Sequence, residues 1–172
     1  SFLTPIQVAR SFGDDVWRLS AIEVAFSIGM IIGGGVIASW GGFKNRVITQ
    51  SFAGVIMGVS TIALGVVPLF SIYLMFMLLF GVAVPIYNTP ASVLLQEKVA
   101  EDYLGRVFGI MSMISTAMMP LGMLIFGPIA DIVSIESLLI GTGIALMLIA
   151  FAYGRNRTLL EAGMPLKKEA EM

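Results

Sequence analysis

The sequence has no cysteine and no histidine among its 172 residues. Without cysteine these residues hold no disulfide, thiol nucleophile or zinc–thiolate site, and without histidine they hold no His-based catalytic triad. No arrangement of serine, lysine or carboxylates resembles a Ser-Lys dyad or a paired-carboxylate site. We therefore expect no enzyme activity, no metal site and no cofactor.

Charge is also scarce. Only 12% of the residues are charged and 58% are hydrophobic, whereas about 25% of a soluble domain is charged. The mean hydropathy is +0.96. The net charge of −1 gives no electrostatic support for binding nucleic acid. Lipid, rather than water, is the solvent that suits this composition.

Long apolar runs make up most of the chain. A membrane-spanning helix needs ~20 apolar residues to cross a hydrocarbon layer of ~30 Å. The sequence has runs of about that length at 19–40, 47–67, 70–95, 107–130 and 134–153. They predict an all-α membrane protein with five transmembrane helices, preceded by an extracellular loop or interfacial segment at 1–18 and followed by a tail at 154–172.

The basic residues between the runs predict the orientation. Eight lie on one side of the predicted membrane: Lys44, Arg46, Lys98, Arg106, Arg155, Arg157, Lys167 and Lys168. Two, Arg10 and Arg18, lie on the other side. Because cytoplasmic loops carry the excess of Lys and Arg, we expect a multi-pass protein of the cell membrane with a cytoplasmic C-terminus.

Paired glycines mark the first two runs. Gly29 and Gly33 form one small-xxx-small pattern, and Gly54 and Gly58 form another. Small residues let membrane helices approach closely. The pattern fits ordinary close packing, a moving interface held by the first two spans, or both.

Prolines and polar groups gather in the third run. Pro85 and Pro90 each remove a helical N–H group, which predicts an interrupted helix. A broken helix in lipid is tolerated against protein or a water-filled cavity. Tyr87, Asn88 and Gln96 are therefore candidates for lining a transport path, the alternative being a kinked structural helix.

The fourth run combines thioethers with small hydroxyls. Ser112, Met113 and Thr116 belong to this pattern. Methionine is flexible and polarisable, so such a surface suits bulky, varied ligands. These residues are further candidates for the substrate path, although methionine is equally common as core or lipid-facing filler.

Glu23 is the acidic residue about one turn inside the first run. An ionisable group within a span is a functional candidate, because burial disfavours its charged form. Glu23 is accordingly the candidate for proton coupling. The alternative places it at headgroup level, solvated or loosely paired with Arg18.

Three stretches carry a resemblance to a known family. They are residues 22–46, 84–98 and 103–108, the last reading Tyr-Leu-Gly-Arg-Val-Phe. The whole chain resembles the C-terminal half of a major facilitator superfamily transporter, and it is most similar to drug–proton antiporters of the macrolide efflux group. The resemblance implies that the five spans correspond to helices eight to twelve of a twelve-helix fold.

The resemblance also implies a function and partners. The expected partners are membrane lipid, the missing N-terminal half of the same transporter, an amphipathic small-molecule substrate and protons, with export by alternating access. Substrate, direction and coupling ion follow from the resemblance alone. The alternative is a small structural or assembly subunit of a membrane complex without transport activity.

The signature loop of that superfamily is only partly present. Its pattern, G-x-x-x-D-R-x-G-R-K, places Gly35, Gly42 and Lys44 at matching positions, whereas Ser39 and Trp40 replace the aspartate and arginine. The charge relay of the motif is thus absent from this half. We expect the remaining basic side chains to pair with acidic groups on neighbouring helices. The gating-loop candidates are Gly35, Gly42, Lys44, Arg46, Gly105 and Arg106.

Overall fold

The computed structural model describes residues 16–164, and this part of the chain is helical without strands. Its elements are α2 (Val16–Trp40), α3 (Arg46–Val66), α4 (Phe70–Lys98), α5 (Glu101–Ile132), α6 (Ile135–Arg155) and α7 (Arg157–Ala162). Five of these helices are long and apolar enough to cross a membrane. The predicted fold class is therefore confirmed. Most of residues 1–18, and the end of the tail, lie outside the described residues.

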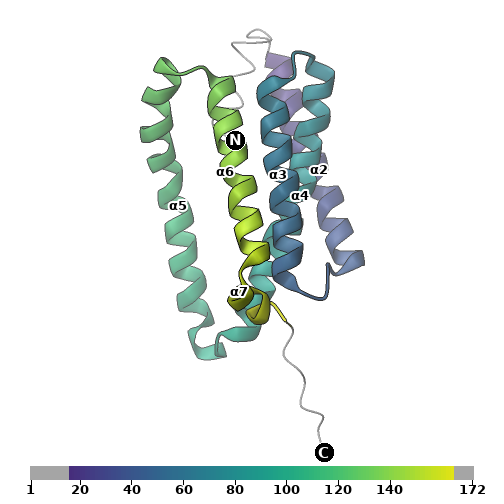
Figure 1. The fold of residues 1–172 in the computed structure, drawn as a ribbon, viewed down its shortest axis with the longest axis vertical. Helices are drawn as coiled ribbons and strands as arrows, with labels where there is room; N and C mark the ends of the chain where they lie inside the picture. The colour runs from purple at the N-terminus through teal and green to yellow at the C-terminus, as the bar shows by residue number, and fades with distance from the viewer. Residues whose placement is uncertain (1–15, 165–172) are drawn as a thin grey trace, which may run out of the picture.

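Helices α2, α3, α4 and α6 pack together, and α5 stands to one side (Figure 1). Helix α3 lies against α6 and α4, and α4 also lies against α2. The core between α2, α3 and α4 contains Ile22, Leu64, Tyr73 and Met77, with Tyr73 fully buried. Helix α5 meets α6 at Ala130, which packs against the start of α6.

The paired glycines mark the contacts between helices. A Cβ atom on Gly29 would collide with the Leu78 carbonyl of α4. A Cβ atom on Gly58 would lie 2.9 Å from the carbonyl oxygen of Gly143 on α6. The close packing is confirmed, and that these contacts move stays a prediction. Each glycine pair packs against a different neighbour, because the spacing defines a smooth helix face and not its partner.

The prolines of α4 do not interrupt the helix as predicted. Helix α4 continues from Phe70 to Lys98 with Pro85 and Pro90 inside it. Each proline removes one backbone hydrogen bond, and packing offsets that loss. Pro85 packs against Gly33, where an added Cβ atom would lie 2.8 Å from Cγ of the proline ring. Pro90 is buried.

Residues 96–106, which lie between the third and fourth predicted spans, are also largely helical. Helix α4 extends to Lys98, and α5 begins at Glu101. The two acidic residues in the first turn of α5, Glu101 and Asp102, complement the positive end of the helix dipole. Consequently the link between α4 and α5 is reduced to Val99 and Ala100.

Candidate functional site

The loop between α2 and α3 is a tight, ordered turn. Gly41 and Gly42 have φ angles of 73° and 81°, a conformation that side chains other than glycine rarely adopt. The Gly41 N–H donates to the Ile37 carbonyl at 2.9 Å and ends α2. The Phe43 N–H donates to Thr49 Oγ1 at 2.9 Å. These bonds fold the loop back onto the first turn of α3.

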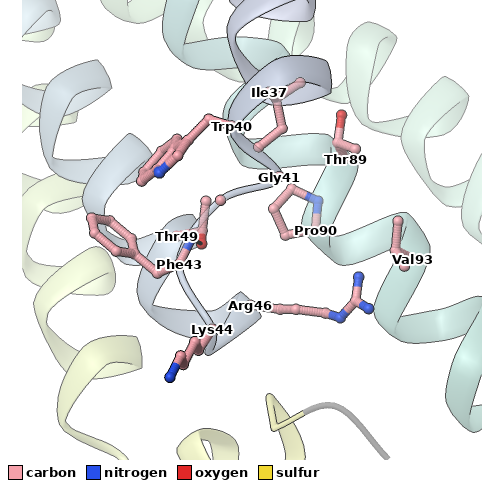
Figure 2. A pocket seen from close by; sticks show the side chains of 11 residues that line it. Ile37, Trp40, Gly41, Phe43, Lys44, Arg46, Thr49, Thr89, Pro90 and Val93 are labelled. Carbon is pink, nitrogen blue, oxygen red and sulfur yellow. Dashed lines mark hydrogen bonds between the residues drawn. The ribbon is translucent and has the colours of Figure 1, made fainter.

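A cavity of about 420 Å³ lies between this loop and α4. Figure 2 shows Arg46 extending toward α4 below Pro90 and Val93, whereas Lys44 points away from that helix. The Arg46 guanidinium forms an ion pair with Glu97 of α4, with both side chains about three-quarters buried. The expected pairing of a basic loop residue with a neighbouring acidic group is thus confirmed for Arg46. Lys44 forms no ion pair with the described residues.

Asn45 joins the same loop to the short helix α7. Its side chain is 6% exposed. The Oδ1 atom accepts from the Val47 N–H at 3.0 Å and caps α3. The Nδ2 atom donates to the Leu160 carbonyl at 2.7 Å, and the Arg46 N–H donates to the Gly163 carbonyl at 3.1 Å. The loop is therefore bonded to α4 by an ion pair and to α7 by two hydrogen bonds.

The other two gating candidates lie on α5. Gly105 and Arg106 are exposed, and the Arg106 guanidinium lies 5.9 Å from the centroid of the Tyr103 ring. Gly35 is exposed near the end of α2, with open space around the position of a Cβ atom. The ion pair and hydrogen bonds of the loop thus involve Arg46 and its neighbours rather than these three residues.

Glu23 lies at the other end of the bundle. It lines a cavity of about 240 Å³ together with residues from four helices: Phe26, Thr61, Leu64, Met77, Phe80 and Leu139. Glu23 is the acidic member of this lining, and its side chain is exposed. The rings of Phe26 and Phe80 are 6.2 Å apart. A carboxylate is thus placed beside aromatic and thioether groups at the edge of the core.

The predicted substrate-path residues are not gathered into one site. Tyr87 lines a cavity of about 130 Å³ between α3, α4 and α6, together with Tyr153. Asn88 and Gln96 are exposed on α4. The three candidates of α5, Ser112, Met113 and Thr116, are exposed on a helix that touches the bundle chiefly near its ends.

Comparison with known proteins places the chain among drug efflux proteins. Macrolide efflux protein A of Streptococcus pyogenes is 30% identical over 150 residues, which cover 86% of this chain and 37% of the relative. Macrolide efflux protein A of Enterococcus faecalis is 33% identical over 123 residues, covering 70% of this chain and 38% of that protein. The chain is a relative of the macrolide efflux proteins. The sequence-based resemblance to that group is confirmed.

A second group of relatives has a broader printed name. The multidrug efflux pump Tap of Mycobacterium tuberculosis is 27% identical over 119 residues, covering 64% of this chain and 27% of the pump. The chain itself therefore spans well under half the length of the curated proteins that it matches. No family model and no solved structure matches it.

Sequence reasoning missed two residues that hold the α2–α3 loop in place. Asn45 and Glu97 were not among the candidate residues, although both bond to the loop that contains Arg46. Asn45 carries a signal, since asparagine before an apolar run is a typical helix N-cap. Its second contact, with a backbone carbonyl 115 residues away, has no signature in the sequence.

Proposed function

We propose that these helices form one wall of a secondary transporter that exports amphipathic compounds, macrolides among them, in exchange for protons. The observation that carries the proposal is the 30% identity to a macrolide efflux protein over 86% of this chain. The transported compound would lie between this wall and the other half of the transporter. Rocking of one half against the other would expose it to each side of the membrane in turn.

The glycines of α5 support the proposal that a helix of the other half of the transporter packs against it. In α2, α3 and α6, Gly29, Gly58 and Gly143 sit against backbone atoms of another helix. On α5, a Cβ atom at Gly105, Gly109, Gly122 or Gly127 would meet nothing within 4 Å. Small residues in membrane helices permit close approach of a partner helix. We infer that α5 packs against the other half of the transporter.

Glu23 is the proposed proton carrier. Its cavity is shared by α2, α3, α4 and α6, so a change in its charge acts on four helices together. Carboxylates within transporter spans serve in proton relays. Protonation and release at Glu23 would then bias how these helices pack at this end of the bundle.

The α2–α3 loop, together with Glu97 of α4 and Leu160 of α7 to which it bonds, forms what we call the loop cluster. This cluster is the proposed hinge region at the opposite end of the bundle. Gly42, Lys44 and Arg46 line the cavity there, and the Arg46–Glu97 ion pair bridges the loop and α4. An ion pair that forms in one state and opens in another changes the relative stability of the two states. Lys44, which has no acidic partner among the described residues, would be available to the other half.

A transport assay with matched carboxylate variants tests this function. The complete transporter is reconstituted into proteoliposomes, and macrolide flux is driven by an imposed pH gradient. Glu23→Gln should abolish pH-driven flux while leaving insertion unchanged. Glu136→Gln is the control, because Glu136 is an exposed residue in the first turn of α6 and lies outside the cavity. Wild-type flux by Glu23→Gln would exclude Glu23 as the proton carrier.

A further inference from the structure

A groove on the surface of α3 and α6 has a different character from the cavities described above. It has a volume of about 420 Å³ and is lined by Ile48, Ser51, Phe52, Val55, Ala150, Phe151, Gly154 and Arg155. The contributing residues of α3 recur at intervals of three and four, so they form one stripe along the helix. The groove follows the helix axis for about 10 Å, since each helical residue rises ~1.5 Å.

Small residues form the floor of the groove and large apolar residues form its walls. At the floor, a Cβ atom on Gly154 would lie 3.1 Å from Ser51 Oγ, which shows how closely α3 and α6 approach. Ser51 Oγ is buried without a hydrogen-bond partner in the described structure. Phe52 and Phe151 rise on either side and are 48% and 65% exposed. The surface around the two rings is thus apolar.

Arg155 stands at one end of the groove, in the last turn of α6. Its side chain is exposed and forms no ion pair or hydrogen bond with the residues from 16 to 164. This end of the bundle also holds the α2–α3 loop and α7 (Figure 1). The groove therefore combines an apolar surface with a cation that has no acidic partner among residues 16–164.

We propose that this groove binds one anionic phospholipid, with an acyl chain between Phe52 and Phe151 and the phosphate group on Arg155. Charge complementarity selects this occupant. Anionic lipids give the cytoplasmic leaflet a negative surface potential, and Arg155 belongs to the basic end of the chain, which is expected on that side. A second copy of the chain would place two Arg155 guanidinium groups near each other if the same face paired with itself. The inference holds whatever compound is transported.

Retention of lipid by the purified protein tests the proposal. The complete transporter is extracted in mild detergent, mixed with equal amounts of phosphatidylglycerol and phosphatidylcholine, and analysed by native mass spectrometry. We expect one retained phosphatidylglycerol, preferred over phosphatidylcholine by roughly fivefold, the preference typical of one basic residue at an anionic surface. Arg155→Gln should remove this preference, and Arg155→Lys should keep most of it. Lys98→Gln, at an exposed lysine near the same membrane face, should have no effect.

A second pair of variants tests the acyl chain. Phe151→Ala should lower retention of both lipids, whereas Leu148→Ala on the same helix should not, since Leu148 is equally exposed but lies outside the groove. Glycerol phosphate added at millimolar concentration should leave the lipid bound; its displacement of the lipid would indicate a free phosphate site and overturn the proposal. Equal retention of the two lipids by the wild type, or an unchanged preference in Arg155→Gln, would also overturn it. A dimer that dissociates when Phe151 is replaced by alanine would overturn the proposal as well.

Discussion

Asn45 offers the sharpest perturbation of the loop cluster. Substituting it with alanine removes the cap of α3, which is worth about 1 kcal/mol. It also removes the hydrogen bond from Nδ2 to the Leu160 carbonyl, which contributes about another 1 kcal/mol. Since Asn45 is 6% exposed, solvent does not replace these bonds in the folded state. The combined loss of about 2 kcal/mol corresponds to a roughly thirtyfold increase in local opening.

Hydrogen exchange measures this opening directly. The Arg46 N–H is bonded to the Gly163 carbonyl, so its exchange reports whether α7 is docked. Asn45→Ala should speed exchange in peptides covering 43–47 and 157–164 by about thirtyfold. Asn45→Ser retains an N-cap oxygen but lacks the amide donor, so it should lose only about 1 kcal/mol, or roughly fivefold.

A variant of α7 itself serves as the control. Asn156 caps this helix by accepting from the N–H groups of Thr158 and Leu159. Asn156→Ala should speed exchange within α7 without removing the cap of α3. If Asn45→Ala left exchange at Arg46 at the wild-type rate, the docking of α7 onto the loop would be refuted.

Three further predictions follow from the contacts of the helices. Gly29→Ala should lower stability in detergent by about 1–3 kcal/mol through overpacking against α4, whereas Gly34→Ala, with open space around it, should not. Arg46→Glu should destabilise the protein, and the double variant Arg46→Glu/Glu97→Arg should recover about 1 kcal/mol of the lost stability. No recovery in a double-mutant cycle would argue against the ion pair. A single cysteine at Arg157, in residues that otherwise contain none, should react with a membrane-impermeant maleimide only after cells are permeabilised. Labelling of intact cells would place residue 157 outside the cell and would contradict the predicted orientation.

The spans could be predicted from sequence because length and apolarity alone determine them. Every predicted run corresponds to one helix. Helix ends were less predictable: residues 101–106 include charged side chains, yet they form the first turns of α5, where Glu101 and Asp102 suit the helix dipole. The polarity of this segment therefore did not mark the start of the helix.

Partners were harder to predict than elements. The spacing of Gly29 and Gly33 indicated a smooth helix face, but only the structure shows that α4 occupies it. In the loop, the pairing of Arg46 could be predicted because its side chain is charged. Leu160 accepts its hydrogen bond through the backbone carbonyl, so its side chain gives no signal in the sequence. Tyr87 and Asn88 are adjacent in the sequence, but Tyr87 lines the cavity between α3, α4 and α6 whereas Asn88 is exposed, because adjacent residues on a helix point in different directions.

Drug accumulation in cells tests the central claim most directly. Cells that lack their own macrolide pumps are made to express the complete transporter, and the uptake of a radiolabelled macrolide is followed with and without a protonophore. The proposed function predicts lower accumulation than in cells without the transporter, and a return to the level of those cells when the protonophore is added. Accumulation that is the same with and without the transporter would contradict it.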